Sequence, residues 1–346
     1  MDREFFFEML STPSCSGNEF VLQQKVAAHY KPDFDKMETD PAGNLYAIIN
    51  PEAKFRVLLC GHSDEICLRV TGVTDDGYLK VTRAGGIRPA MYLGHKVQVW
   101  NGTDTIYGSV VPDRELYKPD LSTDKLLVDI GAKDKAEAEA VVKHGDFVYF
   151  DTDVRPLLGE RFTARAIDDR SGVFVVMEAV KKAKAMGAKV CACACSTVGE
   201  ETTSLGAFYA ANRFQPDCGF AVDVTFATDY PSSEKGGSGE VKLDGGPAID
   251  RGTTLNTVMI RRLEEAADKA GIHLQYEMSN GDTHTDEQKI QYSGKGVPTA
   301  LVSIPLRSMH SPAEVGSMAD IKDCIDLIAQ FLVDLGEGAS FEPYSI

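Results

Sequence analysis

The stretch Phe55-Arg56-Val57-Leu58-Leu59-Cys60-Gly61-His62-Ser63-Asp64 joins an apolar run to a histidine and a carboxylate. The run Phe55–Cys60 and the earlier run Leu45–Ile49 are short and rich in branched residues, which predicts two buried strands. His62 then follows the carboxyl end of its strand, where the ligand sites of open α/β sheets form. We therefore predict an α/β fold with its functional site at this edge of the sheet.

The beginning of the chain and the part after Glu160 alternate between helical and strand patterns, as such a fold requires. The first 30 residues or so predict a helix. Further helices are predicted at Arg170–Met186, Ser204–Asn212, Leu255–Ala270 and Ile321–Leu335, and further strands at Lys189–Ser196, Gly219–Val224, Ile272–Glu277 and Thr299–Ile304.

The segment from about Cys67 to Glu160 has short alternating runs separated by Gly, Asp and Pro turns, a spacing that predicts a small all-β barrel or sandwich. Strands are predicted at Tyr78–Thr82, Lys96–Trp100, Thr105–Val111, Leu126–Ile130 and Phe147–Phe150, with one helix at Asp134–Lys143. We therefore predict a catalytic domain of residues 1–66 and 161–346, with a mixed sheet flanked by helices, interrupted by a β domain of residues 67–160.

The composition is that of an ordinary globular protein, with 43% apolar and 25% charged residues among 346. A formal net charge of −16 argues against a nucleic acid partner, which requires a basic surface. No apolar run approaches the roughly 20 residues of a membrane-spanning helix, so we expect no membrane partner. The segment Met1–Glu8 is acidic where a signal peptide needs a basic flank, so we expect a cytoplasmic protein.

The eight cysteines are predicted to be reduced and structural, since none forms a C-x-x-C pair. Three of them alternate along a predicted strand and would share one face as small apolar side chains. These three are Cys191, Cys193 and Cys195, while Cys15, Cys60, Cys67, Cys218 and Cys324 are scattered.

Five short pieces of the chain offer side chains that bind divalent metals. In the first, Asp64 lies two residues after His62 and points the same way along a strand end. It can therefore accept the second ring proton of a metal-bound histidine, although an ordinary surface turn is the alternative. In the second piece, Asp168-Asp169 precedes a helix. One aspartate suffices to cap that helix, which leaves the other free to bridge two cations, although capping alone also explains the pair.

The other three pieces each follow or lie within a predicted strand. Glu200 and Glu201 point different ways, so one can bind a metal while the other acts as general base, unless both cap the next helix. Asp223 lies inside an apolar strand, where a charge is costly unless it is paired or bound to a cation. His310 alone suggests a structural histidine, but with the other pieces it supplies a second imidazole. Two imidazoles and several carboxylates suit a pair of divalent cations.

Other motifs are weaker. The chain has no Walker, Rossmann or G-x-S-x-G signature, and the glycine-rich stretches Gly85-Gly86 and Gly236-Gly237-Ser238-Gly239 lack phosphate-binding spacing. A polar loop before the final strand contains His284 and Asp286. These two residues are candidates for the substrate pocket, or else belong to an ordinary loop.

Together these residues resemble the glutamyl-aminopeptidase and tetrahedral-aminopeptidase family of two-metal exopeptidases, some of which carry an endoglucanase label. The resemblance covers nearly the whole chain, from Ser16-Gly17-Asn18-Glu19 and Asp40-Pro41-Ala42-Gly43-Asn44 to His310-Ser311-Pro312-Ala313-Glu314. It implies a phosphorylase/peptidase-like α/β catalytic domain. It also implies an inserted, barrel-like β domain that shapes the pocket and mediates assembly into dimers or dodecamers.

The resemblance further implies zinc or cobalt as the two metal ions and a role for each site residue. One ion would be held by His62 and Asp223, the other by Glu201 and His310, with Asp168 as the bridge, Glu200 as the general base and Asp64 as the partner of His62. Unusual peptide geometry is implied between Asp168 and Asp169. The segments Thr202–Ala207, Asp282–Glu287 and Leu306–Met309 depart from the family pattern, so the side-chain preference is not predicted.

We therefore predict a metal-dependent aminopeptidase that removes the N-terminal residue of peptides. A hydroxide shared by the two cations would attack the first peptide carbonyl, with Glu200 carrying the proton. Three alternatives stay open at this point. They are a two-metal deacylase or other amidohydrolase, a glycoside hydrolase built on paired carboxylates, and a non-catalytic assembly protein with a relic site.

Overall fold

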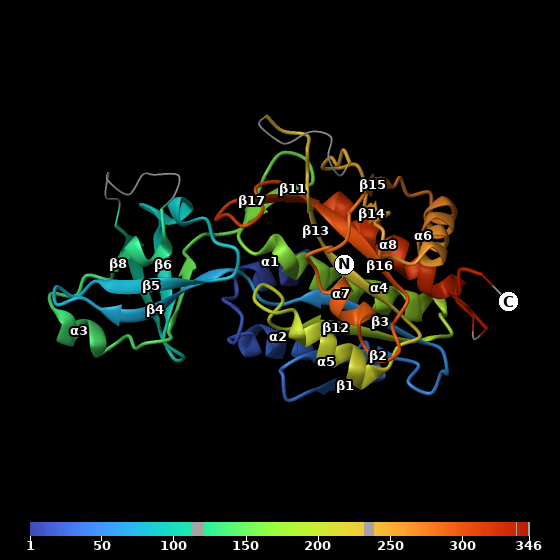
Figure 1. Cartoon of the computed structure of the whole chain (residues 1–346), viewed down its shortest axis with the longest axis horizontal. Coiled ribbons are helices and arrows are strands. Elements are labelled where there is room, and N and C mark those ends of the chain that lie inside the picture. Colours follow the sequence, from blue (N-terminus) through green and yellow to red (C-terminus); the bar gives the residue numbers. More distant parts are fainter. Residues whose placement is uncertain (112–120, 232–238, 337, 345–346) are drawn as a thin grey trace.

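The computed structural model describes residues 1–111, 121–231, 239–336 and 338–344. Most of the glycine-rich stretch at 236–239 lies outside these ranges. The larger part of the molecule is built around an eight-stranded mixed sheet of order β1-β2-β12-β3-β13-β16-β14-β15 (Figure 1). Its strands are β1 (Lys36–Thr39), β2 (Leu45–Ile49), β3 (Arg56–His62), β12 (Cys191–Thr197), β13 (Cys218–Phe226), β14 (Ala248–Asp250), β15 (Gln275–Glu277) and β16 (Thr299–Leu306).

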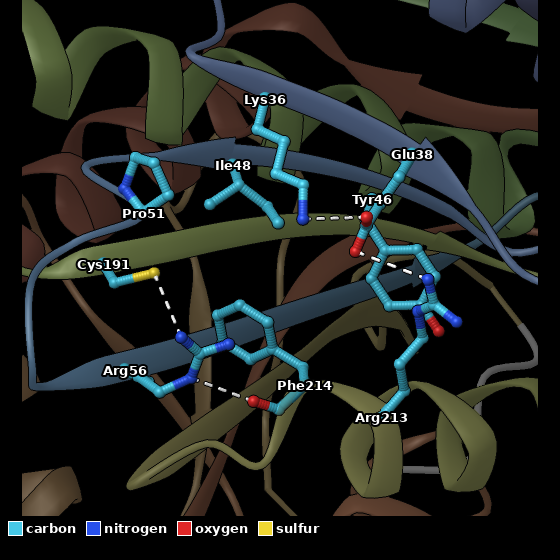
Figure 2. A pocket seen from close by; sticks show the side chains of 9 residues that line it. All are labelled: Lys36, Glu38, Tyr46, Ile48, Pro51, Arg56, Cys191, Arg213 and Phe214. Carbon is cyan, nitrogen blue, oxygen red and sulfur yellow. Dashed lines mark hydrogen bonds and ion pairs between the residues drawn. The ribbon is translucent and has the colours of Figure 1, made fainter.

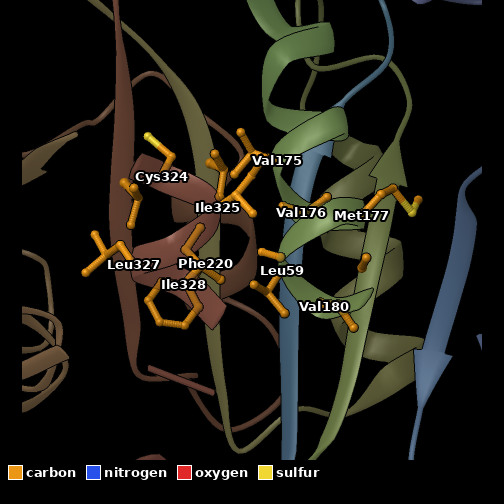
Figure 3. Packing of buried hydrophobic residues seen from close by; sticks show 14 of the residues in the cluster. Leu59, Val175, Val176, Met177, Val180, Phe220, Cys324, Ile325, Leu327 and Ile328 are labelled. Carbon is orange, nitrogen blue, oxygen red and sulfur yellow. The ribbon is translucent and has the colours of Figure 1, made fainter. Parts of the chain in front are cut away.

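Helices cover both faces of this sheet because the buried side chains of its strands alternate between two apolar layers. In β3, Leu59 packs on the α4–α8 side while Leu58 and Cys60 pack on the α5–α7 side. Figure 3 shows the first layer, where Phe220 of β13 meets the apolar faces of α4 and α8. The helices of the first layer are α1 (Arg3–Ser11), α2 (Phe20–Tyr30), α4 (Ile167–Met186), α6 (Thr257–Ala270) and α8 (Met318–Asp334), and those of the second are α5 (Leu205–Phe214) and α7 (Glu287–Gln291). The predicted α/β class is confirmed.

The single helix predicted for the first 30 residues is wrong, because the chain forms two helices there. Helix α1 ends before Thr12, whose backbone is extended at φ −81° and ψ 121°. Thr12 precedes Pro13, and the residue before a proline is disfavoured in helical geometry. The linker between α1 and α2 therefore runs as an irregular segment, and it carries Ser16 and Glu19 toward the sheet.

A closed six-stranded barrel of order β4-β5-β8-β7-β6-β9 lies at one end of the molecule (Figure 1). Its strands are β4 (Cys67–Val73), β5 (Leu79–Ala84), β6 (Lys96–Trp100), β7 (Thr105–Val110), β8 (Leu127–Asp129) and β9 (Phe147–Phe150), with α3 (Lys135–Glu139) and the 3₁₀ turns η1 (Pro89–Tyr92) and η3 (Thr123–Lys125). The chain leaves the sheet after His62 and enters the barrel at Cys67. It returns through a three-stranded sheet of β10 (Arg155–Pro156), β11 (Arg161–Ala164) and β17 (Glu314–Ser317).

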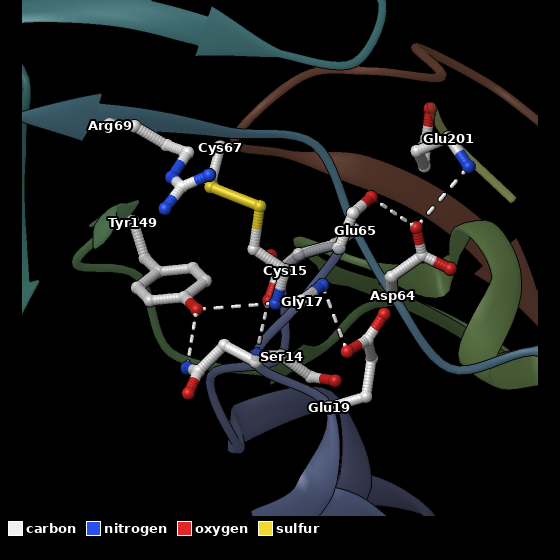
Figure 4. Close-up of a disulfide and its surroundings, with 12 residues drawn as sticks. Ser14, Cys15, Gly17, Glu19, Asp64, Glu65, Cys67, Arg69, Tyr149 and Glu201 are labelled. Carbon is white, nitrogen blue, oxygen red and sulfur yellow. Dashed lines mark hydrogen bonds between the residues drawn. A yellow bond between two sulfur atoms is a disulfide. The ribbon is translucent and has the colours of Figure 1, made fainter. Parts of the chain in front are cut away.

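The prediction that all cysteines are reduced is wrong for one pair. Cys15, in the linker between α1 and α2, is disulfide-bonded to Cys67, the first residue of the barrel, with their Cα atoms 6.1 Å apart (Figure 4). The two are separated by 52 positions, so their meeting depends on tertiary structure that the spacing of cysteines does not reveal. The other six are free and buried, and Cys191, Cys193 and Cys195 do share one apolar cluster.

Among the described residues, none of the helices combines the length and the apolar character needed to cross a bilayer.

Candidate active site

The candidate residues converge because the strands that carry them are neighbours running the same way. Strands β12, β3, β13 and β16 are adjacent and parallel, so their carboxyl ends meet at one edge of the sheet. Thr197 at the end of β12 is paired with His62 at the end of β3, and Asp223 of β13 is paired with Ser303 of β16. The pieces separated in sequence are thus brought to one place by the topology.

Asp168 lies between the two imidazoles. Its Oδ1 is 3.3 Å from Nε2 of His62, and its Oδ2 is 3.1 Å from Nε2 of His310. Glu201 adds an oxygen 3.3 Å from the same atom of His310, and Asp223 an oxygen 4.0 Å from Nε2 of His62. The peptide bond between Asp168 and Asp169 is cis, in agreement with the unusual geometry implied by the resemblance.

These spacings fit divalent cations. Tetrahedral ligands about 2.1 Å from a zinc ion are about 3.4 Å from one another, which is close to the distances between the facing oxygens and nitrogens here. In the described part of the chain, two compact groups of possible ligands stand out. One consists of His62, Asp169 and Asp223, and the other of Asp168, Glu201 and His310.

Asp169 belongs to one of these groups, but its oxygens already have partners. Its Oδ2 accepts the backbone N–H of His62 at 3.1 Å, and its Oδ1 accepts that of Gly172 at 2.9 Å. Asp169 therefore caps the first turn of α4 and ties it to the end of β3. The oxygens of Asp168 face the imidazoles instead, which matches the expectation that one aspartate caps while the other is free.

Asp64 connects three segments of the site. Its Oδ1 accepts the N–H of Glu200 at 3.0 Å, and its Oδ2 accepts the N–H of Glu201 at 3.2 Å and the hydroxyl of Ser16 at 2.6 Å. Nδ1 of His62 is closer to the backbone carbonyl of Asp64, at 3.0 Å, than to its carboxylate, at 3.5 Å. Asp64 thus fixes the ring of His62 mainly through its own backbone and fixes the glutamate pair through its side chain.

Glu200 lies at the open side of the cluster, with its Oε2 3.8 Å from Nε2 of His62 and its Oε1 accepting from the Ser204 hydroxyl at 3.2 Å. Burial raises the pKa of Glu200 to about 8.

Burial also acts to raise the pKa of Asp168, but hydrogen bonds from His310 and His62 outweigh it and hold that pKa below its usual range. The pKa of His310 rises to about 11 because Asp168 and Glu201 outweigh its burial. Both shifts arise from the close pairing of the imidazoles with carboxylates, and divalent cations would take the place of the imidazole protons in that pairing.

The sequence profile of the M42 glutamyl aminopeptidases matches residues 43–327. The chain belongs to this family. This chain is 31% identical to the lysyl aminopeptidase of Pyrococcus furiosus over 344 residues, which span 97% of this chain and 98% of the relative. Among solved structures, an aminopeptidase of Desulfurococcus kamchatkensis aligns with a TM-score of 0.90 at 29% identity, covering 96% of this chain and 95% of its own. The TET1 peptidase of Pyrococcus horikoshii aligns with a TM-score of 0.84 at 29% identity, covering 96% and 99%.

The two residues predicted for the substrate pocket of this M42 chain lie in very different places. The side chain of His284 is 86% exposed, and its ionic partner is Asp282, so the structure does not bring it to the cluster. Asp286 is buried behind the site, where it accepts the hydroxyl of Thr197 at 2.5 Å. Burial raises the pKa of Asp286 to about 6. Asp286 therefore supports the end of β12 rather than facing open space.

Glu314 supports the candidate site but is not among the residues predicted from the sequence. It is buried, and its Oε1 accepts the N–H of His310 at 2.9 Å. Its Oε2 accepts the N–H groups of Ile167 at 2.8 Å and of Asp168 at 3.3 Å. One carboxylate thus joins the two loops that carry Asp168 and His310. The one local signal of Glu314 in the sequence is an acid four residues after His310.

A hollow near the amino ends of β3 and β12, opposite the edge of the sheet that carries the cluster, has no part in the candidate site (Figure 2). It opens at Arg56 and Cys191, the first residues of β3 and β12. Six residues of β3, at about 3.3 Å each, place it about 20 Å from His62. Glu38 is paired with Lys36 at 2.8 Å and Arg213 at 3.6 Å. Since Arg56 also lines the hollow and Glu38 is the one carboxylate among its lining residues, the hollow is net basic.

Proposed function

We propose that this M42 peptidase removes N-terminal residues from peptides with two divalent cations, zinc or cobalt, and with Glu200 as the general base. The observation that carries the proposal is the arrangement of Asp168, whose two oxygens face His62 and His310 at 3.3 and 3.1 Å. A carboxylate shared in this way suits two cations a few ångströms apart, the arrangement found in two-metal hydrolases. His62 and Asp223 would hold one cation, Glu201 and His310 the other, and Asp168 both.

Two bound divalent cations would supply an acidified water and a polarised substrate carbonyl. The residues of the chain transfer the proton and hold the proton-carrying group in place. Glu200 is beside the cluster but outside both groups of ligands, and its raised pKa of about 8 gives it a strong affinity for a proton. It takes the proton of the attacking water and returns it to the leaving amine. Asp64 holds the backbone of Glu200 in place during both transfers.

Peptide substrates with a free amino terminus fit the surroundings of Glu200. The cluster is rich in carboxylates, and the side chains of Glu200 and His310 are 12% and 28% exposed, so it is open on that side. A protonated amine is attracted to such a negative opening. A substrate whose amine is acylated lacks that charge, and a sugar lacks it as well, so neither the deacylase nor the glycoside hydrolase alternative uses this feature.

The test is the variant Glu200→Gln, with Glu139→Gln as the matched control. Glu139 is an exposed glutamate of α3 whose partner is Lys135 at 3.8 Å. We expect Glu200→Gln to lower kcat on aminoacyl p-nitroanilides by about 10²- to 10⁴-fold while binding as much zinc or cobalt as the wild type. The control Glu139→Gln should keep full activity. A chelator should abolish the activity of both the wild type and this control.

The same assay separates the alternatives. Substrates with an acetylated amine should not be cleaved, and hydrolysis confined to them would favour the deacylase. Near-normal turnover by Glu200→Gln would show that another group is the base. Full activity after metal removal would exclude a metal-dependent peptidase.

We further propose that the chain forms homo-oligomers in the cytoplasm. The basis is its likeness to the TET1 peptidase of Pyrococcus horikoshii, which is described as assembling into a tetrahedron or a large octahedral shell. Light scattering coupled to size exclusion should give a mass that is a multiple of 37.6 kDa. A mass of one chain at micromolar concentration would contradict this proposal.

A further inference from the structure

Two adjacent glycines of the barrel, Gly85 and Gly86, lie against the two side chains that we assign to the second cation. A Cβ atom built on Gly86 would be 3.0 Å from Nδ1 and 3.1 Å from Cε1 of His310. A Cβ atom built on Gly85, where φ is +90°, would be 2.6 Å from Cγ2 of Ile66 and 3.3 Å from Oε2 of Glu201. The barrel therefore approaches Glu201 and His310 with bare backbone, at a place where an added Cβ atom would crowd both side chains.

The barrel holds this glycine pair firmly on both sides. Ala84, at the end of β5, packs in a cluster with the disulfide-bonded Cys15 and Cys67. Ile87 is buried in the apolar core of the barrel, and its N–H donates to the carbonyl of Gly85 at 3.0 Å. The position of the glycines is thus set by the barrel and by its disulfide junction with the catalytic part.

His310 needs such a contact because its Nδ1, unlike the Nε2 that faces Asp168 and Glu201, has no hydrogen-bonded partner among the described residues. Its backbone is held at φ +60° by the bond from its N–H to Glu314. The ring of a metal-binding histidine normally donates its other N–H to a carbonyl or carboxylate, as His62 does to the carbonyl of Asp64. Within the described residues, Nδ1 of His310 has no such partner, and it faces Gly86 instead. Packing against the glycine therefore decides how the ring is turned.

We propose that Gly86, supported by Gly85, is a positioning residue that orients His310 for metal binding, so that the barrel completes the site of the second cation. The proposal rests on the proposed function, because it assumes that His310 is a ligand. A methyl group on Gly86 must push the ring by a few tenths of an ångström. Metal ligands tolerate displacements of only about 0.2 Å, so the second cation should be bound more weakly. Loss of such a supporting contact typically costs about 10- to 100-fold in metal affinity.

The test compares Gly86→Ala with the control Gly72→Ala. Gly72 lies in β4 of the same barrel, and a Cβ atom built there would meet no atom within 4 Å. Metal-free proteins are titrated with Co²⁺ and followed by calorimetry and by the visible cobalt spectrum. We expect Gly86→Ala to bind the first ion as the wild type does and the second about 10- to 100-fold more weakly, with an altered spectrum for the second ion only. The control should match the wild type in both steps.

Further measurements guard against trivial explanations. Thermal unfolding of the metal-free variants shows whether each one is folded. If Gly86→Ala is unfolded, Ile87→Val serves in its place, because it loosens the anchor of the glycines without adding volume. Ile87→Val should weaken binding of the second ion by less than tenfold. Equal binding of both ions by wild type and folded Gly86→Ala would overturn the proposal, as would equal weakening of both ions. His310→Ala tests the underlying assignment separately. If it binds two Co²⁺ ions like the wild type, the metal site itself is misassigned.

Discussion

The replacement Asp64→Asn tests whether one buried carboxylate holds the site together. In the wild type, its Oδ1 accepts the N–H of Glu200, and its Oδ2 accepts the N–H of Glu201 and the hydroxyl of Ser16. Asparagine keeps the shape but replaces one oxygen by an NH₂ group, which cannot accept. At least one backbone N–H of the glutamate pair then faces another donor, and the charge that strengthens the other bonds is gone.

The magnitude follows from these bonds. A hydrogen bond to a charged group contributes about 1.5–3 kcal/mol, and leaving a buried donor unpaired costs a similar amount. Losing one such bond and weakening another gives about 3 kcal/mol. If this loss falls on the transition state, where Glu200 must be correctly placed, kcat/KM decreases by about 100-fold.

The assay is kcat/KM on aminoacyl p-nitroanilides, with metal content measured on the same samples. The control is Asp129→Asn, the same chemical change at an exposed residue of β8 that accepts the N–H of Gly131 at 2.8 Å. The control should stay within about twofold of the wild type, as expected for a solvated local bond. The reasoning is refuted if Asp64→Asn, with full metal content, retains kcat/KM within threefold of the wild type.

Two further predictions concern stability. Replacing both Cys15 and Cys67 by Ser should lower the free energy of unfolding by about 4 kcal/mol, the loop-closure value for their separation of 52 positions, and dithiothreitol should then have no further effect. Denaturant titration in urea checks this, and an unchanged midpoint in the double variant would contradict it. Burial and the neighbouring Asp64 raise the pKa of Glu19 to about 7 from an ordinary 4.5. The unfolded chain therefore loses this proton first, so stability should fall by up to about 3 kcal/mol between pH 4.5 and 7, and Glu19→Gln should flatten that slope. Equal pH slopes in urea titrations of the two proteins would count against it.

The sequence predicted the central strands well because their signal is local. The runs around Leu45–Ile49 and Phe55–Cys60 are apolar throughout, and parallel strands buried on both faces need no more than that. The pieces that carry the candidate metal ligands follow those strands, so the rule that sites form at the carboxyl ends of parallel strands predicts that these pieces meet. Strand β4, by contrast, escaped prediction because Cys67–Val73 is part buried and part exposed, without clean alternation.

The supporting residues were out of reach for a different reason. Asp286 and the glycine pair at 85–86 act through contacts with residues far away in the chain, and nothing in their own neighbourhood reveals those partners. Glu314 lies near His310 in the sequence, but its bonds to Ile167 and Asp168 depend on the fold. The disulfide between Cys15 and Cys67 is a further case, since its formation depends on where the barrel meets the catalytic part. Chemical character is visible in a sequence, but which groups meet is a property of the topology.

The wide spacing of the candidate metal ligands also constrains when the site can form. His62 and His310 are separated by 248 positions (310 − 62), and the whole barrel is synthesised between them. A chain emerging from the ribosome therefore has no complete site until almost all of it has been made. Contacts so distant in sequence close late in folding, because the entropy of the intervening loop must be overcome first. The second of the two proposed cations needs His310, so it could bind only once the strand before His310 has joined the sheet. Acquisition of that ion would then mark the end of maturation.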